Sequence, residues 1–311
     1  MAKTPSETGR NTGQRINIVL AIICSILCAL SMFFYYEINR TGKDIINDKN
    51  RLNDLYIVSE EKNIEAADLK ETIDDLDDLD RKIEEIKEDY FRKAVRAEEM
   101  ARNGEAGFKV CYLTFDDGPY RDTTPAFLDI LEEKDVLATF FCLKKEGDDD
   151  IYLREKINCH TIGNHTASHD LKYIYGSIDN FIDDLLENRS FIEEKLGITT
   201  EVMRFPGGSP QVTYMGLDKQ EMVNRLRDLH YGYIDWTLTT GDGGGPTFMS
   251  PEEFLHNVVD SSAKYPVISV LMHDYSTNTL KCLPEMIDIL TEQGFIFLPL
   301  SYDAPIVRKG R

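Results

Sequence analysis

The chain of 311 residues has little positive charge, few cysteines and a long stretch without helix breakers. Its 35 Lys and Arg are outnumbered by 55 Asp and Glu and form no basic stripe, which argues against nucleic acid as a partner. None of the six cysteines forms a CxxC pair, so a zinc knuckle is not expected. Proline is absent between Pro5 and Pro119, and glycine between Gly42 and Gly104, which permits a long helix there.

The cysteines beyond residue 110 admit two interpretations. Cys111, Cys142, Cys159 and Cys282 are scattered along the chain without a regular spacing. We expect buried free thiols, because cysteine is among the residue types most often buried. One or two disulfides in an oxidising compartment are the alternative.

An uncharged apolar run covers residues 16–36 and reads INIVLAIICSILCALSMFFYY. Its length is close to the roughly 20 residues that cross a bilayer, so we predict a transmembrane signal anchor. The basic residues Lys3, Arg10 and Arg15 precede it, and the positive-inside rule therefore predicts a cytoplasmic tail at residues 1–15 with the rest of the chain outside. A cleaved signal peptide is the alternative, but the run lacks the small-x-small site that should follow it.

Residues 37–105 are predicted to form a helical stalk. Apolar residues recur there at steps of three and four, a pattern typical of a coiled-coil seam. A homodimer through this coiled coil and a single solvated helix are both consistent with the pattern. The seam would comprise residues 69, 73, 76, 79, 83, 86 and 90.

Residues 106–311 contain the apolar runs of a folded domain. Seven short runs resemble buried strands, and helix-like stretches lie between most of them. Strands that alternate with helices predict parallel pairing and an α/β fold, as a barrel or an open doubly wound sheet. In both architectures the chemistry collects at the carboxyl ends of the strands. The runs are residues 110–115, 137–143, 160–164, 201–206, 231–238, 267–273 and 295–300.

The helix-like stretches of this domain include two that contain an early proline. Ser250 and Pro251 are expected to open one helix, and Leu283 and Pro284 another, because proline suits the first helical turn. The predicted helices cover residues 123–134, 177–197, 250–264 and 282–294.

Polar residues follow the predicted strands at one end. Asp116 and Asp117 come at the end of the first run. His165 and His169 follow the third run with an i, i+4 spacing, and one helical turn would place both imidazoles on the same side as metal ligands. For either histidine alone, a structural role is the alternative.

Arg204, Asp242 and His273 lie at the ends of later runs. Each of them has a local alternative, as an ion pair, a turn residue or the start of a helix. Charged side chains near the ends of buried strands are costly unless they pair. Because these residues fall at the same end of successive strands, we interpret them as parts of one site.

The motifs that hold these residues resemble signature motifs of the NodB-type polysaccharide deacetylases, carbohydrate esterase family 4. The resemblance extends over about residues 109–300. It implies an irregular (β/α) barrel of about seven parallel strands, and an enzyme that removes N-acetyl groups from the amino sugars of chitin, peptidoglycan and related polymers. The motifs are TFDDGP at 114–119, HTASH at 165–169, RFPGG at 204–208 and LMH at 271–273.

The same resemblance implies a role for each motif residue. Asp117, His165 and His169 would bind one divalent metal ion, usually zinc, with cobalt, nickel or manganese as alternatives. The remaining roles are Asp116 as general base, His273 as general acid, Arg204 as support of the base, Asp242 as partner of the acid, Gly207 as a backbone oxyanion donor, and Leu271 and Trp236 as groups near the oxyanion or the substrate.

The sequence departs from the family pattern at two positions. Gly243 follows Asp242 where members often carry a tryptophan that walls the substrate groove, and Gly207 stands where many carry an aromatic residue. Trp236, the single tryptophan, lies earlier in the chain. These departures leave the metal ligands intact and leave the sugar preference open.

Together these features predict a membrane-anchored, extracellular, metal-dependent polysaccharide N-deacetylase. The anchor and the stalk favour a substrate fixed outside the cell membrane, so peptidoglycan N-acetylglucosamine is the preferred substrate. Chitin-like chains or exopolysaccharides are the alternative substrates. A non-catalytic glycan-binding or scaffold protein of the cell envelope is the alternative function.

Overall fold

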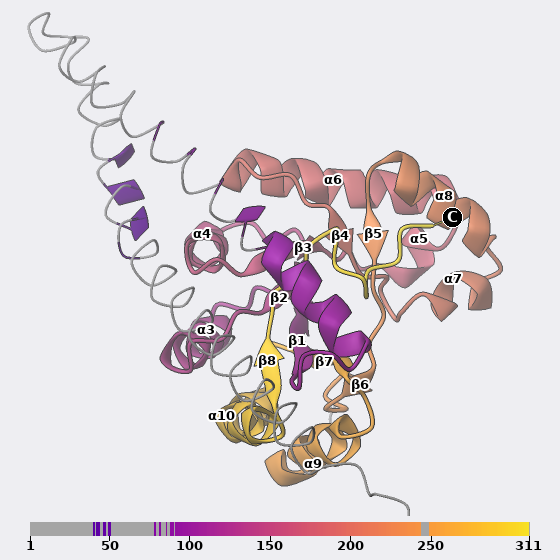
Figure 1. Cartoon of the computed structure of the whole chain (residues 1–311). Coiled ribbons are helices and arrows are strands. Elements are labelled where there is room, and N and C mark those ends of the chain that lie inside the picture. The colour runs from indigo at the N-terminus through magenta and orange to yellow at the C-terminus, as the bar shows by residue number, and fades with distance from the viewer. Residues whose placement is uncertain are drawn as a thin grey trace, which may run out of the picture. The chain divides into compact units, whose positions relative to one another are not determined.

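The computed structural model describes residues 91–243 and 249–310, together with single positions between residues 40 and 89 (Figure 1). The chain divides into two compact units, Met1–Tyr90 and Phe91–Arg311, and the second carries the folded domain. The predicted anchor at 16–36 and the residues of the predicted coiled-coil seam lie outside the described residues. Within the described part of the chain, no helix is both long and apolar enough to cross a membrane.

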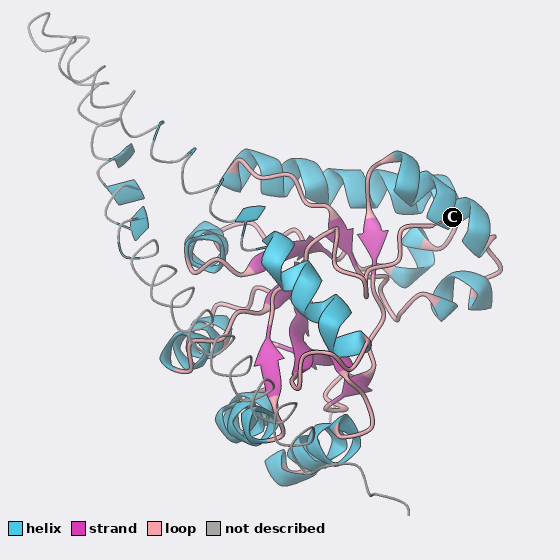
Figure 2. Cartoon of the chain, viewed as in Figure 1, coloured by secondary structure: helices cyan, strands magenta, loops and turns pink. Residues whose placement is uncertain are grey.

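One parallel sheet forms the centre of the second unit, as the magenta strands of Figure 2 show. Seven of its eight strands follow the order β5-β4-β3-β2-β1-β7-β6, and the eighth, β8, pairs with β1 outside this order. No pairing joins β5 to β6 among the described residues, so the sheet is a curled half-barrel. The strands are β1 (Lys109–Asp116), β2 (Thr139–Cys142), β3 (Thr161–Asn164), β4 (Val202–Met203), β5 (Gly232–Tyr233), β6 (Leu238–Thr239), β7 (Val267–His273) and β8 (Phe295–Phe297).

The parallel α/β fold is confirmed, with one strand more than expected. The predicted run 231–238 divides into β5, which pairs with β4, and β6, which pairs with β7. These partners lie toward opposite ends of the sheet order, so the chain must leave one edge before it joins the other. Asp235, between the two strands, accepts hydrogen bonds from the N–H and the hydroxyl of Ser209 and takes no part in the sheet.

Alternation along β1 separates the two faces of the sheet. One apolar cluster, to which the helices contribute, contains Cys111, Leu113 and Phe115. A different apolar cluster contains Val110 and Tyr112. Because side chains alternate along a strand, Thr114 and Asp116 share the face of Val110 and Tyr112. That second face ends in a carboxylate at the carboxyl end of the strand.

Helices surround the sheet (Figure 2). α9 begins as predicted, because the Ser250 hydroxyl accepts from the N–H of Glu253 in a capping box and Pro251 follows in the first turn. The helices that follow β1 are α3 (Thr124–Glu133), α4 (Asp149–Ile157), α5 (Leu171–Ile174), α6 (Ile178–Leu196), α7 (Pro210–Tyr214), α8 (Lys219–Asp228), α9 (Pro251–Ser262) and α10 (Thr277–Glu292).

The predicted start of the last helix is wrong. α10 begins at Thr277 rather than near Leu283, because the Ser276 hydroxyl caps it by accepting from the N–H of Thr279. Pro284 therefore lies inside the helix. An interior proline removes one helical hydrogen bond, and the buried face around Leu283 and Met286 offsets that loss through packing.

The last part of the predicted stalk belongs to the folded unit. Residues 91–102 are helical, and Ala94 and Ala101 lie in the same apolar cluster as Tyr112. The Tyr112 hydroxyl donates to Oε2 of the buried Glu98 at 2.6 Å. The globular unit thus begins at Phe91, before the expected boundary at residue 106.

Three cysteines of the described residues, Cys111, Cys142 and Cys282, are free thiols, as expected. Cys111, Cys142 and Cys282 are buried and Cys159 is half-buried. Burial raises the pKa of the Cys111 thiol well above its ordinary value, so it stays protonated.

Candidate active site

Asp116 and Asp117 leave the end of β1 in different directions. Asp116 is the last residue of the strand and is 3% exposed. Asp117 adopts a left-handed backbone with φ of 72°, which is uncommon outside glycine and typical of functional turns. The regular alternation of the strand therefore ends between the two carboxylates, and they meet different partners.

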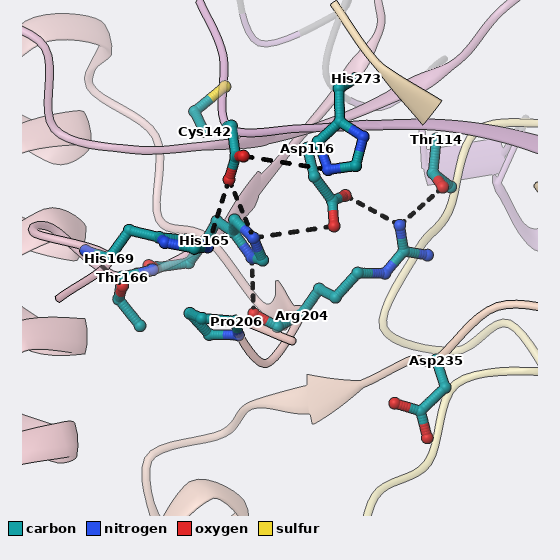
Figure 3. A network of polar contacts seen from close by, with 12 residues as sticks. Thr114, Asp116, Cys142, His165, Thr166, His169, Arg204, Pro206, Asp235 and His273 are labelled. Carbon is teal, nitrogen blue, oxygen red and sulfur yellow. Dashed lines mark hydrogen bonds and ion pairs between the residues drawn. The ribbon is translucent and has the colours of Figure 1, made fainter. Parts of the chain in front are cut away.

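Asp116 is paired with a fully buried arginine (Figure 3). Arg204 Nη1 donates to Asp116 Oδ1 at 2.8 Å and to Thr114 Oγ1 at 2.7 Å. The same guanidinium lies 4.4 Å from the centre of the Phe141 ring. A buried carboxylate is costly without a positive partner, and Arg204 supplies one.

Asp117 instead faces two histidines. Its Oδ1 lies 3.3 Å from His165 Nε2 and 3.4 Å from His169 Nε2. Burial on its own would raise the pKa of the Asp117 carboxyl, but the imidazoles around it outweigh burial and hold that pKa well below its usual range. Asp117 is thus an anion between two ring nitrogens.

The two histidines are brought together by a loop, not by the expected helical turn. Residues 165–170 contain no helix, and both Thr166 and His169 have positive φ, of 72° and 53°. The loop is held from α6, where Oδ1 of the buried Asp184 accepts from the N–H groups of Ala167 and Ser168 at 2.7 and 3.0 Å. Sequence reasoning missed Asp184, because an aspartate in an amphipathic helix reads as a solvated residue.

His165 is oriented by the segment that carries Arg204 (Figure 3). Its Nδ1 lies 2.8 Å from the Arg204 carbonyl oxygen, which can only accept. Nδ1 therefore carries a proton, and Nε2 is the ring nitrogen that faces Asp117. A histidine fixed in this way by a backbone carbonyl is the usual arrangement behind a metal ligand.

These three side chains fit a divalent metal ion. Their donor atoms lie within 4.8 Å of one another. Asp117 Oδ1 is buried, and its contacts with the imidazoles do not have the geometry of hydrogen bonds, so within the described residues it has no hydrogen-bond partner. Bonds of about 2.0–2.1 Å in a tetrahedral site separate the ligand atoms by about 3.3–3.4 Å. The observed 3.3 and 3.4 Å agree with that spacing.

His273 lies at the end of β7 and is held by Asp242. His273 Nδ1 is 2.8 Å from Asp242 Oδ1, and its backbone N–H donates to Asp242 Oδ2 at 2.9 Å. Burial would lower the pKa of His273, but Asp242, together with Asp116 and Asp117, raises it overall. His273 Nε2 points into the site, 3.8 Å from Asp117 Oδ2.

A further buried carboxylate, Asp274, lies at the end of the same strand and was given no role from the sequence. It follows His273, is fully buried, and accepts a hydrogen bond from the Thr124 hydroxyl. Burial raises the pKa of Asp274 to about 7. A Cβ on Gly118 would come within 2.3 Å of Asp274 Oδ2, so only glycine fits in the turn after Asp117.

The segment after Arg204, whose carbonyl contacts His165, turns at two glycines. Gly207 and Gly208 have φ of 75° and 83°, and Gly207 is exposed. Trp236 packs on this turn, because a Cβ on Gly208 would lie 2.9 Å from its Cη2. Trp236 thus contacts the turn where many relatives carry an aromatic side chain. Leu271, in β7 beside Thr114, is buried.

Gly243 cannot carry the side chain that the family pattern places there. A Cβ at Gly243 would lie 2.3 Å from Cε1 of His273, so the backbone itself covers the imidazole. Tyrosines lie nearby instead: the Tyr275 ring is 5.0 Å from His273, and Tyr120 packs edge-on against Tyr275 at 5.3 Å. Both tyrosines are half-buried.

Comparisons with known proteins agree with this geometry. A family model described as polysaccharide deacetylase matches residues 103–225. The Bacillus subtilis protein YheN, described as a polysaccharide deacetylase, is 31% identical over 61% of this chain and 67% of its own. A chitin deacetylase of Colletotrichum lindemuthianum is 30% identical over 59% of this chain and 74% of its own.

A solved structure supports the same conclusion. The catalytic domain of a peptidoglycan N-acetylglucosamine deacetylase from Eubacterium rectale superposes with a TM-score of 0.61 and 32% identity. The match covers 66% of this chain and 93% of that chain. The chain therefore belongs to the polysaccharide deacetylases, carbohydrate esterase family 4, and is a deacetylase built on the NodB-type fold.

Proposed function

We propose that this enzyme removes N-acetyl groups from an extracellular polysaccharide, with peptidoglycan N-acetylglucosamine as its substrate. The proposed reaction uses one divalent metal ion, for which zinc is the preferred candidate. The observation that carries the proposal is the buried Asp117 Oδ1, which faces His165 Nε2 and His169 Nε2 at metal-ligand spacing. Two histidines and one carboxylate leave positions for water and substrate.

Asp116 acts as the general base in this proposal. When bound, the metal ion would acidify a water molecule and polarise the acetamide carbonyl. Asp116 Oδ2 lies 3.7 Å from His165 Nε2, beside the metal ligands, and can accept the proton of the attacking water. Arg204 holds Oδ1 of the same carboxylate at 2.8 Å, which fixes its direction.

The bond changes then involve Gly207 and His273. The water oxygen bonds to the acetamide carbon, and the carbonyl oxygen takes the negative charge, which the Gly207 N–H stabilises by donating a hydrogen bond. His273 gives its Nε2 proton to the nitrogen as the carbon–nitrogen bond breaks. Acetate and a free amino sugar leave the site.

Asp242→Asn is expected to change the pH dependence of this proton transfer. Asp242 helps to hold the pKa of His273 above its ordinary value, so the imidazole stays protonated to higher pH. Without that charge the pKa falls, and the alkaline limb of the kcat/KM profile moves to lower pH. Asp260→Asn, which alters an exposed carboxylate beside His256, is the control. An alkaline limb that stays in place in Asp242→Asn would contradict the role of His273 as the acid.

Substrate identity is tested by acetate release from purified peptidoglycan and from chitooligosaccharides. The relative from Eubacterium rectale supports peptidoglycan and that from Colletotrichum lindemuthianum supports chitin-like chains. We expect faster release from peptidoglycan. Faster release from chitooligosaccharides would instead favour chitin-like or exopolysaccharide chains, and no release from either would favour a glycan-binding scaffold.

We further propose that residues 16–36 anchor the chain in the cell membrane, with residues 1–15 in the cytoplasm and the catalytic unit outside. The uncharged apolar run and the basic residues before it support this arrangement. A homodimer through the stalk at 37–105 is part of the same proposal. Protease treatment of intact cells, which should degrade the catalytic unit, tests the orientation, and sedimentation with and without residues 69–90 tests the dimer.

A further inference from the structure

The turn that follows Arg204 exposes the backbone N–H of Gly207. Gly208 N–H donates to the Phe205 carbonyl at 2.7 Å and closes the turn. The N–H of Gly207 has no acceptor among the described residues, and the residue is exposed. This is the group that the proposed function uses to stabilise the oxyanion.

A buried tyrosine from another segment holds the same peptide unit. Tyr175, directly after α5, is 2% exposed, and its hydroxyl donates to the Pro206 carbonyl at 2.8 Å. Its ring stacks on Phe181 of α6 with a centroid distance of 5.6 Å, which fixes the direction of the hydroxyl. Burial raises the pKa of Tyr175, so the hydroxyl remains a donor.

The Pro206 carbonyl and the Gly207 N–H belong to one planar peptide group and point in opposite directions. A donor that fixes the carbonyl therefore also fixes the N–H, and it strengthens the N–H as a donor by polarising the group. The turn is tied down on either side of this peptide, where His165 bonds the Arg204 carbonyl and Asp235 bonds Ser209.

We propose that Tyr175 is a positioning residue that aims the Gly207 N–H at the oxyanion. The inference rests on the proposed function, because it assigns a purpose to the donor of that mechanism. Among the described residues, Tyr175 makes no hydrogen bond with the metal ligands or with His273, and it acts through a peptide group.

Tyr175→Phe tests this role, because it keeps the ring on Phe181 and removes only the hydroxyl. We expect kcat to fall about three- to tenfold, the change that one neutral hydrogen bond supports, with KM within about twofold of the original. Tyr112→Phe is the matched control, since it removes a buried tyrosine hydroxyl that bonds Glu98. Tyr112→Phe should lower the free energy of unfolding about as much as Tyr175→Phe does, but it should leave kcat unchanged.

A direct probe of the peptide group is available, because the dipeptide Pro-Gly occurs only at residues 206–207. Carbonyl-13C proline combined with 15N glycine gives one NMR cross-peak for this peptide in the full chain. The peak should move in Tyr175→Phe and not in Tyr112→Phe.

The role of Tyr175 and the proposed function are tested by different outcomes. An unmoved cross-peak, or an unchanged kcat in Tyr175→Phe, overturns the role of Tyr175 while the wild type still releases acetate. A wild type that releases no acetate overturns the proposed function, and with it the purpose assigned to Tyr175. An equal loss of kcat in Tyr112→Phe would also overturn the role, because the effect would then follow stability.

Discussion

Replacing Asp117 with alanine is expected to abolish acetate release and to leave the protein without its metal ion. The variant removes the carboxylate oxygen that faces both His165 Nε2 and His169 Nε2. Loss of a residue that hydrogen-bonds a metal ligand typically lowers metal affinity or activity about 10–100-fold. Loss of the ligand itself should therefore lower them by more than that. Metal content by mass spectrometry and acetate release are measured on the same samples.

Asp116→Asn is the matched comparison, because it alters the neighbouring carboxylate. Asp116 pairs with Arg204, so its loss should leave the metal content unchanged. Acetate release should fall by about 10²–10⁴, the range for loss of a general base. Equal loss of the metal in both variants, or a metal ion retained in Asp117→Ala, would contradict the roles of Asp117 as ligand and Asp116 as base.

Arg204→Met is expected to destabilise the fold by about 3–5 kcal/mol, because it leaves a buried carboxylate without its positive partner. Arg204 is fully buried and also bonds Thr114, Ser269 and the Ile234 carbonyl, so several donors are lost at once. The free energy of unfolding from urea denaturation measures the effect. Activity should fall as well, since Asp116 loses the group that orients it.

Two variants sharpen this prediction. Arg225→Met breaks an exposed pair with Asp179 and should cost less than about 1 kcal/mol. Adding Asp116→Asn to Arg204→Met should recover part of the lost stability, because the unpaired charge is removed. A cost for Arg204→Met no larger than that of Arg225→Met would show that the buried pair is not what stabilises this end of the barrel.

The sequence predicted the strands and the residues at their ends because both depend on local patterns. The run before Asp116 is long and apolar, and the motif residues follow directly after strands. The carboxyl ends of parallel strands lie at the same edge of the sheet, so Asp117, His165 and His273 come together there.

Groups that support the site from a distance were not predicted, because their signals are not local. Asp184 and Tyr175 reach loops that are 16 to 31 residues away along the chain. Nothing in an amphipathic helix marks one aspartate as the acceptor of a loop. The prediction of a helical turn between His165 and His169 is wrong for the same reason, since Asp184 holds the loop between them in a non-helical conformation.

Other differences arise where tertiary packing outweighs a local rule. Pro284 suits a first helical turn, but the Ser276 cap and a buried apolar face begin α10 earlier. Residues 91–102 continue the pattern of the stalk, yet the buried Glu98 and its bond with Tyr112 fix them to the folded unit. Each case required the partner residue, which lies elsewhere in the chain.

The catalytic metal is tested most directly by acetate release from peptidoglycan by the full chain before and after removal of metal. We predict that a chelator abolishes release and that added zinc restores it, with one metal ion bound per chain. Full acetate release by the metal-stripped protein would contradict the assignment of Asp117, His165 and His169 as ligands of a catalytic metal.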